Sequence, residues 1–212
     1  CGKSTLVNLI PRFYDVTDGK ITIDGKDIRN VSQHELREKL GYVPQKAVLF
    51  SGDIASNILY GNPDGSEAEM TEAATIAQAT EFIEQKKKKY KSTISQGGSN
   101  VSGGQKQRLS IARAIAKHPD IYIFDDSFSA LDYKTDATLR AKLKEKTSES
   151  TVMIVAQRIS TILHADQIIV LDDGQIVGKG THKELLKNCE AYYQIASSQL
   201  SEKELEEDLK EV

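Results

Sequence analysis

The chain has 212 residues, of which 39% are hydrophobic and 28% charged, and its formal net charge at pH 7 is −3. This length allows one sizeable domain with a buried core. No apolar run approaches the roughly 20 residues of a membrane-spanning helix, and the slightly acidic balance argues against a nucleic-acid partner.

The first fifty residues are predicted to alternate between helix and strand. Apolar residues at helical spacing indicate a helix, and Ser32 with Glu35 three residues later forms a capping box that marks a second helix start. The predicted elements are a helix from Ser4 to Tyr14, a strand from Lys20 to Ile23 entering a turn at Asp24-Gly25, a helix from Ser32 to Leu40, and a strand from Leu40 to Val43 that Pro44 stops.

A helix-rich stretch follows, and strands return near residue 121. The apolar run Ile121 to Phe124 is typical of a parallel strand that is buried on both faces, and Asp125 and Asp126 follow at its carboxyl end. The other predicted elements are helices from Glu67 to Ala79, Val101 to Lys117 and Thr135 to Lys146, a strand from Thr151 to Ala156, a hairpin from Gln167 to Leu171 and Gln175 to Lys179, and a last helix that starts near His182. The tail from Ser197 to Val212 carries six acidic residues against two lysines and is predicted to be an exposed or frayed helix.

This order of elements predicts a three-layer α/β domain with a helical insertion. The basic run Lys86 to Lys89 stands alone, and we expect a solvated helix end there. Cys1 and Cys189 form neither a disulfide framework nor a zinc site, so we expect reduced thiols in a cytoplasmic protein. Three aromatic residues are assigned to the core and four histidines to the surface or to helix caps: Tyr42, Tyr122 and Phe124, and His34, His118, His164 and His182.

The amino-terminal string suggests phosphate chemistry. Gly2, Lys3, Ser4 and Thr5 match the last four positions of the loop G-x-x-x-x-G-K-[ST], and they precede a predicted helix. Such a loop presents backbone N–H groups to phosphate oxygens, a lysine to the β and γ phosphates, and a hydroxyl to magnesium. Magnesium also requires a carboxylate at the end of a neighbouring buried strand, which is the predicted place of Asp125.

The string from Val101 to Arg108 identifies the family that the sequence resembles. It reads V-S-G-G-Q-K-Q-R and ends thirteen residues before the strand at Ile121. This resembles the signature L-S-G-G-Q-x-Q-R of the ATP-binding cassette (ABC) family, which lies equally close to its Walker B strand. The other motifs follow in the family's order: the end of Walker A at Gly2 to Thr5, the Q-loop at Gln45, Walker B at Ile121 to Asp125, and the D-loop at Ser129 to Asp132.

The resemblance implies a fold and a set of site residues. The fold is that of a P-loop NTPase, with a RecA-like core at 1–46 and 118–196, an inserted helical subdomain at 47–117 and an acidic tail at 197–212. The implied nucleotide-binding residues are Cys1, Gly2, Lys3, Ser4, Thr5, Gln45, Ser102, Gly103, Gly104, Gln105 and Asp132; the implied magnesium ligands are Ser4, Gln45 and Asp125; and the implied catalytic residues are Asp126 and Gln157. In this family the signature faces the nucleotide on another subunit, so the resemblance implies a second ABC ATPase domain as partner.

The segment from Ala47 to Ile58 resembles L-F-x-G-T-I-x-x-N-I, which follows the Q-loop in exporter-type transporters and receives the coupling helices of the membrane domain. The resemblance therefore implies an ATPase that powers efflux at the cytoplasmic face of the plasma membrane. It also implies a transmembrane domain upstream on the same full-length chain, and the start inside the Walker A loop leads us to expect a fragment of such a protein.

Two positions depart from the family's pattern. Asp126 stands where efficient members have glutamate, and Gln157 stands where they have the switch histidine. Aspartate is about 1.5 Å shorter in reach, and an offset near 1 Å costs on the order of a hundredfold in rate. Glutamine is able to bind a γ-phosphate but does not replace an imidazole in proton transfer. Together they resemble the degenerate half of heterodimeric exporters, whose own site hydrolyses MgATP weakly while its intact signature completes a site on a different chain.

Two alternatives stay open at this stage. One is a soluble ABC ATPase of the translation or DNA-repair type, which the exporter-like segment after Gln45 disfavours. The other is a regulatory module that binds ATP without hydrolysing it. The transported substrate is not predicted from these residues.

Overall fold

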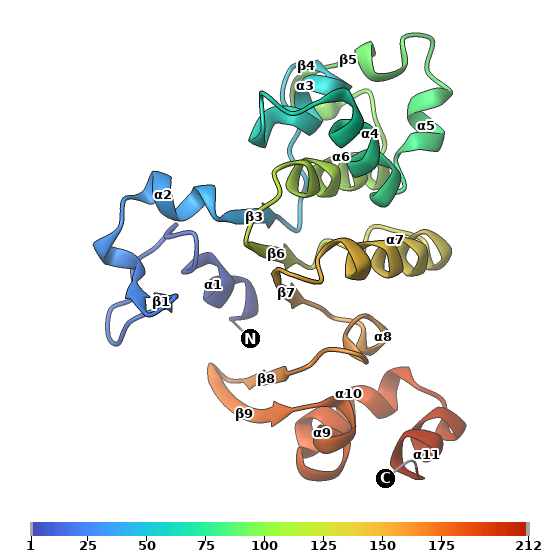
Figure 1. Ribbon diagram of the computed structural model, residues 1–212. Coiled ribbons are helices and arrows are strands. Elements are labelled where there is room, and N and C mark those ends of the chain that lie inside the picture. The colour runs from blue at the N-terminus through green and yellow to red at the C-terminus, as the bar shows by residue number, and fades with distance from the viewer. Residues whose placement is uncertain (1, 211–212) are drawn as a thin grey trace. The chain divides into compact units, whose positions relative to one another are not determined.

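The computed structural model describes residues 2–210 (Figure 1). The chain divides into two compact units. The central unit is Asn8–Val155, and the terminal unit combines Cys1–Val7 with Ala156–Val212. These units cross the boundaries predicted for the RecA-like core and the helical subdomain, and that finer division stays a prediction.

The central unit is built around three parallel strands in the order β3-β6-β7. β6 lies between the other two strands, and its side chains Tyr122, Ile123 and Phe124 are at most 2% exposed. A strand buried on both faces needs a continuous apolar run, which is why its sequence does not alternate. The strands β3 (Leu40–Val43), β6 (Ile121–Asp125) and β7 (Thr151–Val155) confirm the three predicted strands closely.

The other central elements are short strands and helices. The antiparallel pairs are β1 (Thr22–Ile23) with β2 (Lys26–Asp27), and β4 (Gly52–Asp53) with β5 (Thr93–Ile94). The α-helices are α2 (Gln33–Glu38), α3 (Ile54–Ile58), α4 (Glu67–Ile76), α5 (Thr80–Glu84), α6 (Gly103–Ala116) and α7 (Tyr133–Lys146). Short 3₁₀ turns occupy Ile28–Asn30, Leu59–Gly61, Lys89–Lys91 and Gln96–Gly98.

Helix α6 is the packing centre of the central unit. Its residues Leu109, Ile111 and Ile115 are at most 1% exposed, and the helix packs against α3, α4 and β3. His118, with φ of +52°, and Pro119 follow the helix and prevent its continuation. The predicted helix from Val101 to Lys117 is therefore confirmed apart from its end residues.

The terminal unit contains one hairpin and a set of helices. β8 (Ile168–Asp172) pairs antiparallel with β9 (Gln175–Gly180), as predicted. Asp173 and Gly174 both have positive φ, the conformation of the two-residue turns that match strand twist. The helices are α1 (Lys3–Asn8), α8 (Ile159–Ile162), α9 (His182–Asn188), α10 (Glu190–Gln199) and α11 (Glu202–Lys210).

The acidic tail differs from its prediction. It does form a helix, α11, but Leu205 is only 8% exposed and belongs to an apolar cluster with Leu185, Tyr192 and Ala196. The helix is therefore packed on one side instead of being exposed throughout or frayed. The apolar side of the helix consists of one leucine per turn, and every other position of the helix is charged.

The assignment of every histidine to the surface or a cap was wrong for His182. Its side chain is buried, with Nδ1 2.7 Å from the Tyr192 hydroxyl and Nε2 3.1 Å from the Asp208 carboxylate. Burial of an imidazole is tolerated when both ring nitrogens have partners, and these partners come from α10 and α11. Tyr122 and Phe124 are core residues as predicted, whereas Tyr42 is only half-buried.

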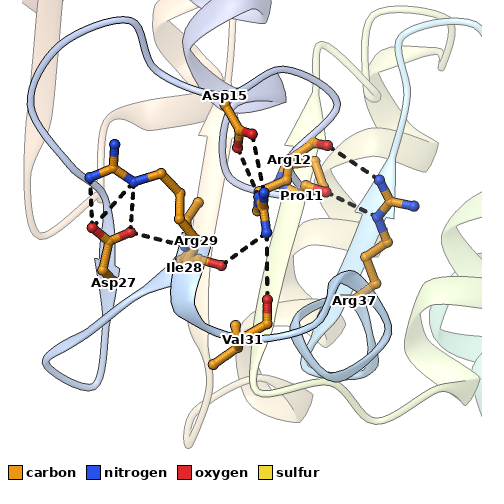
Figure 2. A network of polar contacts seen from close by, with 8 residues as sticks. All are labelled: Pro11, Arg12, Asp15, Asp27, Ile28, Arg29, Val31 and Arg37. Atoms are coloured by element: carbon orange, nitrogen blue, oxygen red, sulfur yellow. Dashed lines mark hydrogen bonds and ion pairs between the residues drawn. The ribbon is translucent and has the colours of Figure 1, made fainter.

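The predicted helix from Ser4 to Tyr14 is wrong in its second half, because α1 ends at Asn8. Pro11 supplies no N–H, and Arg12 has a φ of +54°, so helical hydrogen bonds do not continue. Arginine side chains hold the chain after the helix (Figure 2): Arg37 Nε donates to the Pro11 carbonyl at 3.0 Å, and Arg12 Nε donates to Asp15 Oδ1 at 2.8 Å.

The same network holds the turn after β2. Arg12 Nη1 approaches the carbonyls of Ile28 and Val31 at 3.4 and 3.5 Å, and Arg29 Nη2 donates to Asp27 Oδ2 at 2.7 Å (Figure 2). The side chain and backbone N–H of Arg29 lower the pKa of Asp27 to about 2.

This pKa shift predicts an acid transition. A carboxyl whose pKa is lower in the folded state stabilises the fold above its unfolded pKa, and this contribution is lost as the pH falls from about 4 to about 2. Arg29→Gln should raise the Asp27 pKa toward its ordinary value of 3.8. Carboxyl-carbon NMR titration measures this directly, with Arg140→Gln on α7 as the control. An Asp27 pKa that stays near 2 in Arg29→Gln would contradict the assignment.

Candidate nucleotide-binding site

The predicted site residues are divided between the two units, and Cys1 lies outside the described residues. The terminal unit holds Gly2, Lys3, Ser4, Thr5 and Gln157, and the central unit holds Gln45, Ser102, Gly103, Gly104, Gln105, Asp125, Asp126 and Asp132.

The phosphate-loop residues lie at the start of α1. Gly2 has a φ of +84°, a left-handed conformation that a side chain would strain, and its carbonyl accepts the Leu6 N–H at 2.9 Å. Lys3, Ser4 and Thr5 form the first turn of the helix. Backbone N–H groups in a first helical turn have no partner within the helix, so this turn offers donors to an anion.

Two carboxylates lie at the carboxyl end of β6. Asp125 is the last residue of the strand and is 4% exposed, and Asp126 is 8% exposed with a φ of +48°. The Asp126 N–H donates to the Val155 carbonyl at 2.9 Å, and the Ser129 hydroxyl donates to the Asp126 carbonyl at 3.0 Å. The chain reversal after β6 is therefore held by hydrogen bonds on both sides of Asp126.

The structure brings Gln45 and Asp126 together. Gln45 Nε2 donates to Asp126 Oδ2 at 3.1 Å, and the buried Ser127 hydroxyl donates to the Val43 carbonyl at 2.8 Å. Both bonds join the segment after β3 to the segment after β6. They follow from the parallel pairing of the two strands, which places their carboxyl ends at one edge of the sheet.

Tyr42 is a site neighbour that the sequence prediction placed in the core. Burial, and secondly the charge of Asp125, raise the pKa of Tyr42 to about 12. Its hydroxyl donates to Asn8 Oδ1 at 2.8 Å. Only the register of β3 against β6 places this tyrosine beside Asp125, so no local pattern could have found it.

The signature residues begin α6. Ser102 is the N-cap: its hydroxyl accepts the Gln105 N–H at 3.2 Å, and the Gln105 side-chain carbonyl accepts the Ser102 N–H at 3.1 Å. These two residues therefore also form a capping box. A methyl group added at Gly103 would have no neighbour within 4 Å, whereas one at Gly104 would lie 3.4 Å from the Ala130 carbonyl. The backbone at Gly103 is thus open to approach at the positive end of a helix dipole.

Asp132 and Gln157 have local partners as well. Asp132 is the N-cap of α7, where its carboxylate accepts the Thr135 N–H at 3.0 Å, and this bond lowers the pKa of Asp132. In the terminal unit, the Gln199 side chain donates to the Gln157 carbonyl at 2.8 Å.

Gln107 was given no role from the sequence. It is 2% exposed and donates to the Pro44 carbonyl at 3.1 Å, so it ties α6 to the segment before Gln45.

The predicted magnesium ligands are divided between the units, with Ser4 in the terminal unit and Gln45 and Asp125 in the central unit. A hydroxyl from Ser4, an amide oxygen from Gln45 and a carboxylate from Asp125 are hard oxygen ligands, and Mg²⁺ commonly uses one or two carboxylates together with substrate phosphates. Residues 2–210 contain no group of three or more His, Cys, Asp or Glu side chains arranged for a metal. Along the same described stretch, every helix is too short or too polar to span a bilayer.

Comparison with known proteins identifies the family. A family model described as "ABC transporter" matches residues 1–129. The chain is 49% identical over 201 residues to an uncharacterized ABC transporter ATP-binding protein of Mycobacterium tuberculosis (strain H37Rv), covering 93% of this chain and 34% of that protein. It is 46% identical over 198 residues to a putative multidrug export ATP-binding/permease protein of Staphylococcus aureus (strain NCTC 8325), with the same two coverages of 93% and 34%.

A solved structure agrees with these relatives. The structure of a bacterial Atm1-family ABC exporter with ATP bound matches with a TM-score of 0.91 and 41% identity, over 95% of this chain and 35% of that one. The chain thus spans about a third of the length of these proteins. The family match, the motifs in order and the shared fold show that the chain belongs to the ABC transporter family, as a nucleotide-binding domain with the P-loop NTPase fold that is homologous to the ATP-binding proteins of exporters.

Proposed function

We propose that this domain binds MgATP and powers efflux as one ATPase domain of an exporter whose two nucleotide sites are unequal. The observation that carries the proposal is the pair formed by Gln45 and Asp126 at the end of β6, next to Asp125. An aspartate holds the position of the catalytic carboxylate there. The names of the relatives, which include multidrug export and ATP binding, support the general activity.

The proposed roles follow from the chemistry of each side chain. The N–H groups of the first turn of α1 and the Lys3 ammonium would bind phosphate oxygens, and Ser4, Gln45 and Asp125 would hold magnesium. Magnesium held there would neutralise charge on the phosphates. Asp126 accepts a hydrogen bond from the water that attacks the γ-phosphate, and Gln157 contacts that phosphate.

The proposed weakness of this site has one cause at Asp126 and another at Gln157. The Asp126 carboxylate is one methylene shorter than glutamate, and one of its oxygens already accepts the Gln45 amide at 3.1 Å. A backbone anchored to Val155 restricts how far the carboxylate can move toward a water molecule. Gln157 donates a hydrogen bond but carries no titratable proton near neutral pH. We therefore expect slow hydrolysis and long retention of ATP.

The intact signature is proposed to serve a different chain. Gly103 has open space where a phosphate would approach, and α6 directs its positive end at that space. A second ABC ATPase domain would place its own nucleotide there. The partner is expected to be a different protein, because two copies of this chain would supply two weak sites.

The membrane side of the proposal rests on an exposed surface, here called the aromatic surface, made of Val48, Phe50 and Tyr60. Their side chains are 54%, 42% and 59% exposed. Since the S. aureus relative is named for both ATP binding and a permease, and this chain spans 34% of it, we propose that a permease domain upstream on the full-length chain covers this surface. The domain would then work at the cytoplasmic face of the plasma membrane.

The first prediction from the proposed function concerns the two departures from the family's pattern, Asp126 and Gln157. Asp126→Glu with Gln157→His should raise hydrolysis at this site on the order of tenfold to a hundredfold, because the carboxylate gains about 1.5 Å of reach. Single-turnover hydrolysis of labelled ATP by the assembled transporter measures this rate. Asp126→Asn with Gln157→His is the matched control and should stay slow.

Single turnover by the assembled transporter, together with steady-state turnover by a homodimer, has three distinct outcomes. Brisk turnover by a homodimer of the unmodified domain would refute the unequal-site proposal. A complete absence of chemistry at this site in single turnover would favour the alternative of a regulatory module that only binds ATP. Slow hydrolysis that the double variant accelerates supports the proposal.

The second prediction concerns the signature. Gly103→Ala should leave the free energy of unfolding within about 1 kcal/mol of the parent, because the added methyl group meets nothing in this chain. Hydrolysis at the partner's site should fall on the order of a hundredfold, since the methyl group blocks close approach of the phosphate. Urea unfolding and ATPase assays of the heterodimer measure the two quantities. Lys142→Ala on the exposed side of α7 should change neither, and full activity of Gly103→Ala would exclude signature donation.

The third prediction concerns the aromatic surface. Val48→Asp should abolish the change in tryptic cleavage of the permease part that a non-hydrolysable ATP analogue induces in the complete transporter, because a charge would be buried at the interface. Ile176→Asp, at an exposed apolar position of β9, is the control and should retain the change. An unaltered cleavage pattern in Val48→Asp would refute the docking role of this surface.

A further inference from the structure

Arg113 makes contacts that the proposed nucleotide chemistry does not use. It lies in the last turn of α6, and its guanidinium reaches a segment more than fifty residues earlier. Nε donates to the Asn57 carbonyl at 2.9 Å, Nη2 donates to Asn57 Oδ1 at 2.9 Å, and Nη1 donates to the Val48 carbonyl at 3.0 Å. All three nitrogens of the guanidinium are therefore directed at this one segment.

Asn57 connects Arg113 to the loop that precedes α3. Asn57 is 1% exposed; its amide nitrogen donates to the Phe50 and Asp53 carbonyls at 2.9 and 3.0 Å, and its oxygen accepts the Phe50 N–H at 2.9 Å. The Arg113 guanidinium donates to the same oxygen. A buried amide with all of its groups bonded holds a single conformation, so the backbone at Phe50 is held through Asn57.

The guanidinium also contacts the two rings of the aromatic surface. Phe50 and Tyr60 stack with centroids 4.4 Å apart, and the Arg113 guanidinium carbon lies 5.0 Å from the Phe50 centroid and 5.7 Å from the Tyr60 centroid. Both distances are within the range of cation–π attraction. Burial lowers the pKa of Arg113. The two rings are thus held from the protein side while they remain partly exposed to solvent.

Lysine could not replace this side chain. A planar guanidinium donates in several fixed directions and stacks on aromatic faces, whereas an ammonium is a point charge with a strong hydration shell. The position of Arg113 on α6 also matters, because the same helix begins at the signature cap Ser102, about 16 Å away at 1.5 Å per residue. One rigid helix therefore carries the signature at one end and holds the aromatic surface near the other.

We propose that Arg113 is a positioning residue, which holds Val48, Phe50 and Tyr60 in the arrangement that docks the permease domain and links that surface to the signature helix. This inference rests on the proposed docking function of the aromatic surface. Its first half, the positioning of the two rings, does not depend on any partner.

The positioning is tested by fluorescence. The sequence has no tryptophan, so Tyr60→Trp introduces a single emitter at the surface. In this background, Arg113→Lys should raise the acrylamide quenching constant about twofold and shift the emission to longer wavelength, because the ring at position 60 loses its contact with the guanidinium. Arg140→Lys is the matched control: Arg140 donates from Nε and Nη2 to Asp136 at 2.8 and 3.2 Å on α7, away from the emitter. Equal quenching in Arg113→Lys and its parent would overturn the proposal.

The link to the permease domain is tested in the complete transporter purified with its partner. The readout is the change in tryptic cleavage of the permease part on addition of a non-hydrolysable ATP analogue, divided by the analogue bound in the same sample, so that loss of folded protein cancels. Arg113→Lys should reduce this ratio at least fivefold, and Arg140→Lys should keep it. A ratio within twofold of the parent in Arg113→Lys would overturn the proposal.

The Val48→Asp variant separates the two possible failures. Where Val48→Asp abolishes the cleavage change and Arg113→Lys retains it, the docking function stands and the role of Arg113 is refuted. Where both variants retain the change, the proposed docking function has failed and this inference fails with it.

Discussion

The parallel pairing of β6 between β3 and β7 is the constraint on which the central unit depends. It buries Tyr122, Ile123 and Phe124, and it brings the carboxyl ends of neighbouring strands to one edge of the sheet. Asp125 and Asp126 lie at that edge because they follow the apolar run directly. The same pairing explains why Gln45, two residues beyond β3, reaches Asp126. Val43 pairs with Phe124, so the residues that follow the two strands lie beside each other.

Helix α6 joins the rest of the central unit to this edge. Its amino end is closed by the reciprocal bonds of Ser102 and Gln105, its middle packs against α3, α4 and β3, and Gln107 bonds the chain just before Gln45. Near its other end, Arg113 holds the aromatic surface. Because a helix is stiff along its axis, these features belong to one rigid element, which the proposed docking of a permease domain would use.

Several elements were predicted well because local chemistry decides them. The strands β3, β6 and β7 rest on apolar runs, the hairpin β8-β9 on its turn at Asp173-Gly174, and the cap of α2 on the pair Ser32 and Glu35. The failures came where distant residues intervene. The first helix stops at Asn8, before Pro11, and Arg37 from α2 bonds the Pro11 carbonyl. His182 is buried because Tyr192 and Asp208 come from later helices.

The sequence by itself determined the family and the identity of the candidate site residues, because phosphate binding demands particular residue types at fixed spacing: glycines for close approach, a lysine, a hydroxyl, and an acid after a buried strand. Tertiary structure alone decided which of these side chains contact one another. The bond from Gln45 to Asp126, the place of Tyr42 beside Asp125 and the clamp of Arg113 on Asn57 join residues 56 to 83 positions apart. Contacts of that length are set by sheet register and helix packing, which no local pattern of residues encodes.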